Sequence, residues 1–371
     1  RRPDGDIGME AAANEQADSN AKERRGVCTA ICASLRRART LVLILLVMQT
    51  SAIVLLMHYS RTRQAPPYLP SIAVALAEAA KLPTCLFMAA YAAGSFKGLL
   101  RLLQVQVLGE PMETLKCAVP AIAYTLQSNL LFVALTNLDP PTYQVVYQSK
   151  TIFTALFSLW MLSRRLVLSQ WVALALLFFG TVFVSDTRTA RSHAHANPLL
   201  GFFAVLSAAV LSSGSSVYFE RMLKKRSTCT VPGAEAASLW IRNIQLGLFA
   251  LPIAIIGVLA TDLQHVQTHG MLHGFDALVW LVVLLNGVGG LLVAATMKYA
   301  DNIVKCFAAA LAIVFSTLLS VPLFHFSLQP VFVAGASCTV VASVLYARAP
   351  KCENGEAAYE PLPTAPQREQ A

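Results

Sequence analysis

Residues 139–162 read DPPTYQVVYQSKTIFTALFSLWML and place a lysine, Lys150, in the middle of an apolar run. A helix needs roughly 20 mostly apolar residues to cross a hydrocarbon layer of about 30 Å, because each residue rises about 1.5 Å. A lysine at that depth costs about 2.5–3.5 kcal/mol on insertion scales. The stretch therefore predicts a membrane-spanning helix whose charged residue has a function beyond the fold.

The pattern returns 162 positions later, where residues 301–324 read DNIVKCFAAALAIVFSTLLSVPLF. The offset superposes four identical residues, pairing Asp139 with Asp301, Phe153 with Phe315, Leu156 with Leu318 and Ser158 with Ser320. Each copy opens a predicted span at the matching place of a five-span half. Because five is odd, the halves enter the membrane from opposite sides, which predicts the inverted repeat common among secondary transporters.

The whole chain of 371 residues is unusually apolar, with 56% hydrophobic and 13% charged residues. An average soluble domain carries about 25% charged residues, so an ordinary water-soluble globule is excluded. The sequence predicts an all-α integral membrane protein with ten transmembrane helices, near residues 40–59, 70–93, 115–136, 140–162, 168–186, 198–221, 237–260, 276–297, 300–323 and 329–347.

Lysine and arginine residues divide unequally between the two sides of the predicted membrane. One side collects most of them, namely Arg36, Arg37, Arg39, Lys97, Arg101, Arg164, Arg165, Arg221, Lys224, Lys225, Arg226, Lys298, Arg348 and Lys351. The other side has Arg61, Arg63, Arg188 and Arg191. Cytoplasmic loops keep the positive excess, so we expect a multi-pass protein with both termini in the cytoplasm. The net charge of +9 does not indicate a nucleic-acid partner, because the basic residues are not interleaved with aromatic residues on a polar face.

These spans divide the chain into three parts. We expect a disordered cytoplasmic tail over residues 1–39 and a second cytoplasmic tail over residues 351–371. The ten-helix domain between them, residues 40–350, has repeat halves over about 40–190 and 196–350.

The lysines inside the spans indicate a binding site. Lys150 and Lys305 have no acid within one helical turn, and as residues of the central helices of opposite halves they are expected to face one cavity. Their neighbours are aromatic, amide and hydroxyl residues, namely Tyr124, Gln127, Asn129, Tyr143, Gln144, Tyr147, Gln148, Asn243 and Gln245. Such a cavity offers positive charge to a phosphate and polar groups and rings to a base or sugar. The alternative is that the tyrosines anchor the helices at the interface and the lysines snorkel to the surface.

Four other acidic or basic residues, in two pairs, have two interpretations each. Glu78 and Lys81 lie three residues apart on one helix, so they form either a structural ion pair or a gate. Asp139 and Asp301 either cap the helices that follow them or contact a ligand. The spans hold no paired carboxylates or P-loop, and the cysteines lack metal-site spacing, so we expect neither an enzyme nor a metal or other cofactor.

Several long motifs resemble the Golgi nucleotide-sugar transporters, in the branch that carries CMP-sialic acid, UDP-galactose and UDP-N-acetylglucosamine. The resemblance covers roughly residues 40–350 and rests on six stretches: MQTSAIVLLMHYSRT from 48, YTLQSNLLFVALTNL from 124, YQVVYQSK from 143, SSGSSVYFE from 212, SLWIRNIQLGLF from 238 and KYADNIVKCF from 298. It implies a drug/metabolite transporter fold that exchanges a cytosolic nucleotide sugar for a luminal nucleoside monophosphate.

Carried over position by position, the resemblance implies that Lys150 and Lys305 contact the phosphates. The nucleotide contacts that it implies are Tyr124, Tyr143, Ser213 and Asn243. The family usually has a second amide at Ser128 and a threonine at Val146, which puts hydrogen bonds there in doubt. Where the sialic acid carrier has a nucleotide-contacting tyrosine this chain has Gly247, and its NIQLGLF and GGLLVA runs look like those of the UDP-sugar carriers.

The expected function is therefore exchange of UDP-galactose or UDP-N-acetylglucosamine for UMP across the Golgi membrane. We expect Lys150 and Lys305 to bind the phosphates. The residues expected to bind the base and ribose are Tyr124, Gln127, Asn129, Tyr143, Ser213 and Asn243. A CMP-sialic acid/CMP antiporter and a non-transporting membrane partner of glycosyltransferases are the alternatives. Association with a second copy or with a glycosyltransferase is left open.

Overall fold

The computed structural model describes residues 37–57, 59–60, 68–138, 140–184, 197–225, 231, 233–324 and 330–349. Asp139 and most of the two predicted tails lie outside these residues. All regular structure within the described residues is helical: an N-terminal helix Arg37–Met57, α2 Pro70–Ala92, α3 Phe96–Leu103, the π-helix η1 Gln104–Leu108, α4 Pro111–Lys116, α5 Ala118–Asn137, α6 Pro140–Gln148, α7 Lys150–Met161, α8 Leu168–Val184, α9 Pro198–Lys224, α10 Ala234–Thr261, α11 Leu263–His269, α12 Ala277–Tyr299, α13 Asn302–Phe324 and α14 Pro330–Arg348.

Helical structure occupies each of the ten ranges predicted to span the membrane. Seven helices of the described part are long and apolar enough to cross one, namely the N-terminal helix, α2, α9, α10, α12, α13 and α14. Of the others, α8 has 17 residues. The helix α5 has 20 residues but carries Gln127 and Asn129 near its middle, which lower its mean hydropathy. The protein is thus an all-helical membrane protein.

Two predicted spans are broken by a change in backbone hydrogen bonding. The range 115–136 is divided at Cys117 between α4 and α5, because Pro120 has no N–H to donate to the carbonyl of Lys116. The prediction of one continuous helix over 140–162 is wrong at Ser149, whose N–H bonds three residues back to Val146 O (3.1 Å). The helix α7 therefore begins at Lys150.

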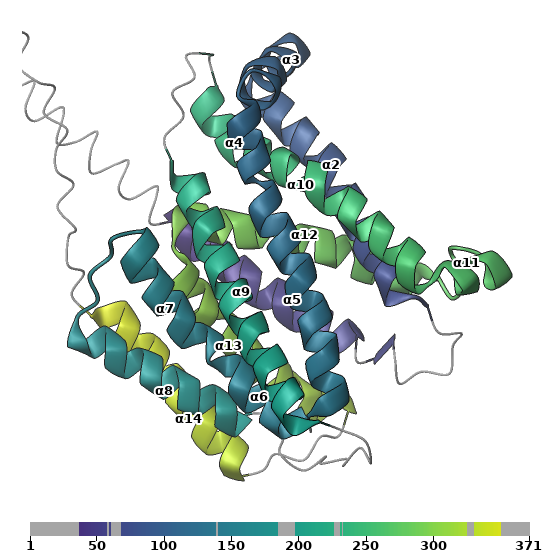
Figure 1. Ribbon diagram of the computed structural model, residues 1–371. Coiled ribbons are helices and arrows are strands. Elements are labelled where there is room, and N and C mark those ends of the chain that lie inside the picture. The colour runs from purple at the N-terminus through teal and green to yellow at the C-terminus, as the bar shows by residue number, and fades with distance from the viewer. Residues whose placement is uncertain are drawn as a thin grey trace, which may run out of the picture.

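The helices pack in extensive pairs (Figure 1), with α8 against α14, α2 against α10 and α5 against α9. Glycines set the closest approach. A Cβ added at Gly335 of α14 would lie 2.7 Å from the carbonyl oxygen of Gly180 on α8, so the two backbones touch there. Small residues of this kind let helices approach in a membrane, where packing replaces the hydrophobic effect as the driving force.

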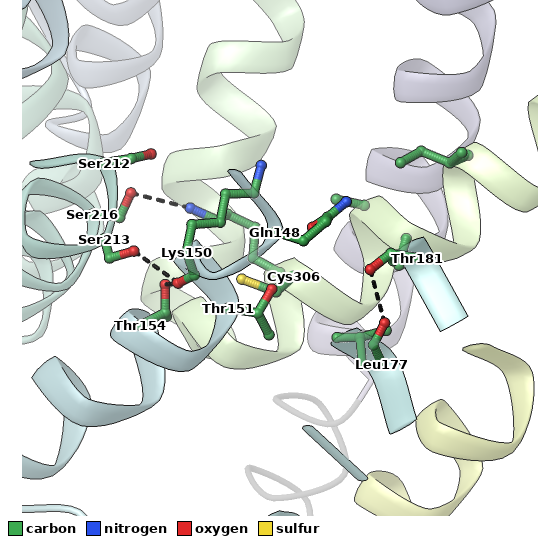
Figure 2. Close-up of a pocket in the computed structure, with 14 residues that line it drawn as sticks. Gln148, Lys150, Thr151, Thr154, Leu177, Thr181, Ser212, Ser213, Ser216 and Cys306 are labelled. Carbon is green, nitrogen blue, oxygen red and sulfur yellow. Dashed lines mark hydrogen bonds between the residues drawn. The ribbon is translucent and has the colours of Figure 1, made fainter. Parts of the chain in front are cut away.

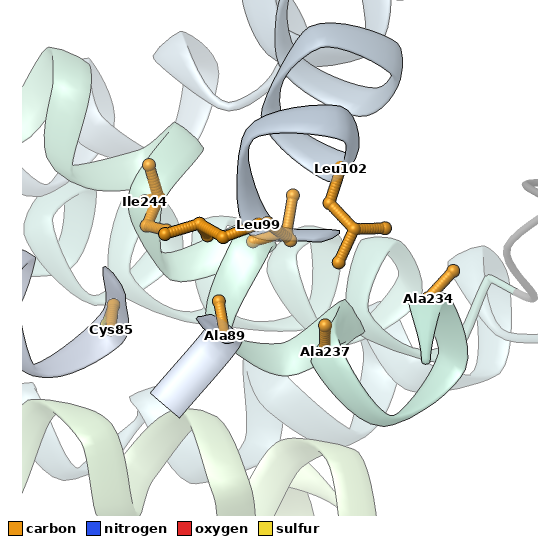
Figure 3. Close-up of a cluster of buried hydrophobic side chains, with 8 residues drawn as sticks. Cys85, Ala89, Leu99, Leu102, Ala234, Ala237 and Ile244 are labelled. Atoms are coloured by element: carbon orange, nitrogen blue, oxygen red, sulfur yellow. The ribbon is translucent and has the colours of Figure 1, made fainter. Parts of the chain in front are cut away.

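A core of small and branched side chains joins α2, α3 and α10 (Figure 3). Its buried members are Cys85, Ala89, Leu99, Leu102, Ala234, Ala237, Ile241 and Ile244. A second core joins α7, α8, α13 and α14 around Ala155, Ala173, Leu174, Leu177, Ile303, Phe307, Ala310 and Ala342. These two cores lie in different parts of the bundle, and the polar residues of the candidate site lie outside both.

The contact between α8 and α14 predicts a matched pair of variants. Gly335→Ala is expected to destabilise the protein by about 1–3 kcal/mol, because its Cβ would meet the backbone of Gly180. Gly257→Ala is the control, since no atom lies within 4 Å of the Cβ position there. The unfolding midpoint of each purified variant in detergent gives the measurement. Equal midpoints for the two variants would show that α8 and α14 can move apart without a loss of stability.

Candidate functional site

A cavity of about 110 Å³ lies between the end of α6 and helices α7, α8, α9 and α13 (Figure 2). Lys150 at the start of α7 and Lys305 in α13 both line it, as the sequence predicts. The remaining lining residues are Gln148, Thr151, Thr154, Leu177, Thr181, Ser212, Ser213, Ser216, Cys306, Ala309, Ala310 and Ile313. The cavity thus has two amino groups, five hydroxyl-bearing neighbours from α7 and α9, and an apolar floor.

The two lysines have polar but uncharged partners. Lys305 Nζ donates to Ser216 Oγ (3.3 Å). Lys150 Nζ lies over the ring of Tyr147, 4.3 Å from its centroid. Neither lysine forms an ion pair with a carboxylate of the described residues. The cavity therefore carries uncompensated positive charge, and an anion that enters it gains the interaction that both amino groups lack.

Tyr124 and Ser213, both predicted from the sequence, lie beside the lysines. The hydroxyl of Tyr124 lies 3.2 Å from Ser216 Oγ, the group that also binds Lys305. Ser213 is 2% exposed, and its hydroxyl donates to the carbonyl oxygen of Lys150 (2.8 Å). These bonds tie α5 and α9 to both lysine-bearing helices.

Gln127 and Tyr143 reach the lysines through Tyr147. Gln127 Nε2 donates to the Tyr147 hydroxyl (3.1 Å), and the rings of Tyr143 and Tyr147 stack with centroids 5.8 Å apart. Gln127 Oε1 is buried and has no hydrogen-bond partner among the described residues. An acceptor of this kind, close to stacked rings, suits the donor groups of a planar base.

The structure does not bring Asn129 or Asn243 to the cavity. The amide of Asn129 is exposed and donates to Thr125 O on its own helix (3.0 Å). The amide of Asn243 is buried and donates to Leu239 O, one turn back (2.8 Å). The sequence analysis placed Asn129 with the lysines by residue type and Asn243 also by the family resemblance, whereas in this conformation each amide donates to backbone.

The sequence analysis missed five hydroxyl-bearing cavity residues, Thr151, Thr154, Thr181, Ser212 and Ser216. A signal for two of them was present. Thr151 and Thr154 are followed by Ser158, and all three are buried on one side of the otherwise apolar α7. Polar residues three or four apart share a helix face, so this spacing indicates a polar wall.

The predicted pair of Glu78 and Lys81 forms within α2, with Lys81 Nζ 2.6 Å from Glu78 Oε1. The lysine lies against α12, where a Cβ added at Gly290 would lie 3.1 Å from Nζ. Gln49 of the N-terminal helix reaches the same helix and donates to Leu285 O (2.9 Å). The glycines of α12 therefore make room for long polar side chains rather than only for helix contact.

Asp301 caps α13, the first of its two predicted roles, by accepting a hydrogen bond from the N–H of Val304 (2.8 Å). Its carboxylate also lies 3.6 Å from Arg164. The same arginine binds Glu220, which is fully buried and also binds Lys224 (2.6 and 2.7 Å). A buried carboxylate between two cations closes the Lys- and Arg-rich end of the bundle, next to the start of α13.

A second carboxylate, Glu113 of α4, links that helix to α9 and α10. It lies 2.7 Å from Lys116, 3.0 Å from Lys225 and 3.5 Å from Arg242. Arg242 also donates to Gln245 Oε1 (2.9 Å), so Gln245 belongs to this network and not to the cavity. Hydrogen bonds from Lys116 and Lys225 lower the pKa of Glu113 to about 2.

The lowered pKa predicts how stability depends on pH. The ion pairs of Glu113 stabilise the fold fully above its ordinary pKa of 4.5, and this effect is lost as the pH falls toward about 2. Glu113→Gln should therefore lower the unfolding midpoint at neutral pH, and the difference from the wild type should shrink in acid. Glu235→Gln is the control, because Glu235 is exposed and forms no ion pair with the described residues. A difference for Glu113→Gln that grows in acid would contradict the assignment.

Comparisons with known proteins agree on one family. The sequence profile of the family described as nucleotide-sugar transporter matches residues 35–347. The UDP-N-acetylglucosamine transporter of Bos taurus is 43% identical over 320 residues, which cover 83% of this chain and 94% of the relative. The UDP-galactose translocator of Mus musculus is 40% identical over 343 residues, covering 91% of this chain and 85% of the relative.

A third relative, the UDP-galactose/UDP-N-acetylglucosamine transporter srf-3 of Caenorhabditis elegans, is 39% identical over 310 residues, covering 83% of this chain and 82% of the relative. A solved crystal structure matches with a TM-score of 0.58 and 19% identity, over 83% of this chain and 96% of its own. That likeness shows a shared fold.

Proposed function

The chain belongs to the nucleotide-sugar transporter family, and we propose that it exchanges a cytosolic UDP-sugar for luminal UMP across the Golgi membrane. The family and the relatives are transporters and not enzymes. The observation that carries the proposal is the pair of uncompensated amino groups, Lys150 and Lys305, in one cavity between the central helices. UMP and the UDP-sugar share the nucleotide, so one site that binds it serves both directions.

The chemistry of the cavity supports a phosphate ligand. Its two lysines supply charge, and the hydroxyl groups of Thr151, Thr154 and Ser216 supply hydrogen-bonding partners. Tyr124 and Ser213 position the lysines, while Gln127 and Tyr143 serve the base. Asn129 and Asn243 then join the ribose only after a change of side-chain conformation.

The proposal includes ten spans in two inverted five-helix halves, with both termini in the cytoplasm. Two hydrogen bonds support it. Ser213 Oγ donates to Lys150 O (2.8 Å), and Ser51 Oγ donates to Ala312 O (3.0 Å). The offset of 162 residues carries Ser51 onto Ser213 and Lys150 onto Ala312. The same bond therefore occurs once in each direction between the halves, as two inverted copies of one unit require.

Helix pairing gives the same symmetry. The pair α2 and α10 joins the second helix of each half, and the pair α8 and α14 joins the fifth. Each pair joins corresponding helices of the two halves, and the pairs lie on both sides of the central site. One half can therefore rock against the other about that site. Ligand pockets usually enclose about 300–1,000 Å³, so the cavity of about 110 Å³ is too small for a nucleotide sugar. We infer that the described conformation is closed, and that binding requires the halves to separate.

The relatives' names and one glycine favour a UDP-sugar over CMP-sialic acid. A Cβ added at Gly247 would lie 2.7 Å from Leu82 Cδ2. A tyrosine, which the sialic acid carriers have there, would require the Leu82 side chain of α2 to move. Galactose and N-acetylglucosamine differ only at C2 and in the configuration at C4, and the relatives include transporters named for each.

Exchange predicts stimulation from the opposite side of the membrane. Uptake of labelled UDP-galactose or UDP-N-acetylglucosamine into proteoliposomes should rise when the vesicles are preloaded with UMP, because one site carries both. Preloading with AMP is the control, since a pyrimidine site should not accept a purine equally well. Uptake that is the same with UMP, AMP and empty vesicles would contradict exchange.

Removal of one phosphate contact gives a second prediction. Lys150→Ala should weaken UMP binding about 10–100-fold, because a hydrogen bond to a charged group contributes roughly 1.5–3 kcal/mol. Lys97→Ala, an exposed lysine on α3, is the matched control and should bind as the wild type does. Quenching of intrinsic fluorescence by UMP gives both dissociation constants. Wild-type affinity in Lys150→Ala would remove Lys150 from the site.

A further inference from the structure

A second cavity of about 920 Å³ lies between the N-terminal helix, α13, α14 and the segment that leads into α8. We call it the basic groove. Its charged end contains Arg39, Arg164, Arg165, Lys224 and Asp301. Its other walls are apolar and run along the helices, with Leu43, Val47 and Met48 on one side and Phe307 and Leu311 on the other. None of these residues lines the cavity that holds Lys150 and Lys305.

The charges of the basic groove do not balance. Arg164 and Lys224 are engaged by Glu220, and Arg164 also by Asp301. Arg39 is half-buried and Arg165 is exposed, and neither forms an ion pair with a described residue. Two guanidinium groups that line this one cavity are thus left without a carboxylate partner among the described residues, and guanidinium groups bind phosphate oxygens well.

The apolar part of the basic groove has the length of one membrane leaflet. Nine residues separate Arg39 from Met48, which at about 1.5 Å per residue is about 13 Å along the helix. Half of a hydrocarbon core of about 30 Å is about 15 Å. Ile44 and Met48 on this helix are 55% and 52% exposed. A ligand that matches both parts has an anionic head and an acyl chain.

We propose that the basic groove binds one anionic phospholipid, with its phosphate at Arg39 and Arg165 and an acyl chain along Val47 and Phe307. Residues 351–371 follow α14 in the sequence and contain four glutamates. A phospholipid suits the groove better, because it offers an acyl chain to the apolar walls as well as an anion to the charged end. The lipid head binds beside Asp301 and Lys224, so it stabilises the end of the bundle where α13 begins.

The test measures the unfolding midpoint of the full chain in neutral detergent during titration with a lipid. Dioleoyl phosphatidylserine should raise the midpoint more than dioleoyl phosphatidylcholine, because only the former carries a net negative head. Inorganic phosphate alone should not reproduce the rise. Equal responses to the two lipids would overturn the proposal. Occupation of the groove by residues 351–371 is one arrangement that would give this result. A full response to phosphate alone would assign the site to a free anion instead.

Two matched pairs of variants locate the effect. Arg39→Gln combined with Arg165→Gln should require about tenfold more phosphatidylserine for the same rise. Lys97→Gln combined with Arg101→Gln removes two exposed cations of α3 and should leave the response unchanged. Val47→Trp fills the apolar wall and should abolish the preference for phosphatidylserine, whereas Leu45→Trp, outside the groove on the same helix, should keep it. A wild-type response in the Arg39 and Arg165 double variant would overturn the proposal.

Discussion

Two amino groups share one small cavity without a carboxylate, and this constraint explains the arrangement around them. Lys150 and Lys305 could not stay charged in an apolar core, so their surroundings are built from groups that stabilise a cation without neutralising it. These are the hydroxyl of Ser216 and the ring of Tyr147. A carboxylate in the same place would hold the cavity closed and compete with every anion. The uncompensated charge is what makes an anionic substrate favourable there.

The positions of the two lysines depend on backbone as much as on side chains. The helix breaks at Ser149, so Lys150 stands at a helix start rather than inside one. Ser213 of α9 then donates to the Lys150 carbonyl, and Ser51 of the N-terminal helix donates to the carbonyl of Ala312 in α13. If the two halves are inverted copies, as we propose, each half contacts the central helix of the other through one hydroxyl. A motion that breaks one bond would then have an equivalent that breaks the other, as alternating access requires.

The sequence predicts the helices and the two lysines well, since both follow from local composition: apolar runs of sufficient length, and charges within them. It also predicts the cap at Asp301 and the ion pair of Lys81, which need only neighbours along one helix. It fails where a residue has two choices of partner. Asn129 and Asn243 carry suitable side chains, but each amide donates to a backbone carbonyl one turn back on its own helix. The contacts of Ser216 with Lys305 and Tyr124 join segments that are far apart in the chain, which one sequence does not encode locally.

The cations that stabilise the fold are paired with carboxylates, whereas those we propose to bind ligands are not. Glu220 and Glu113 each gather two or more cations at the Lys- and Arg-rich end, where removal of a buried partner would strand the rest. The pairs there link α4, α9, α10 and the start of α13. Lys150, Lys305, Arg39 and Arg165 have no such partner among the described residues, and each pair lines a cavity. An unpaired cation is costly in a low-dielectric medium, which is the argument for a ligand at Lys150 and Lys305 inside the bundle. At the exposed Arg165 and the half-buried Arg39 the argument is instead the match of two cations with an apolar groove. The two cavities differ in shape, and we propose a different anion for each, one water-soluble and one held by the bilayer.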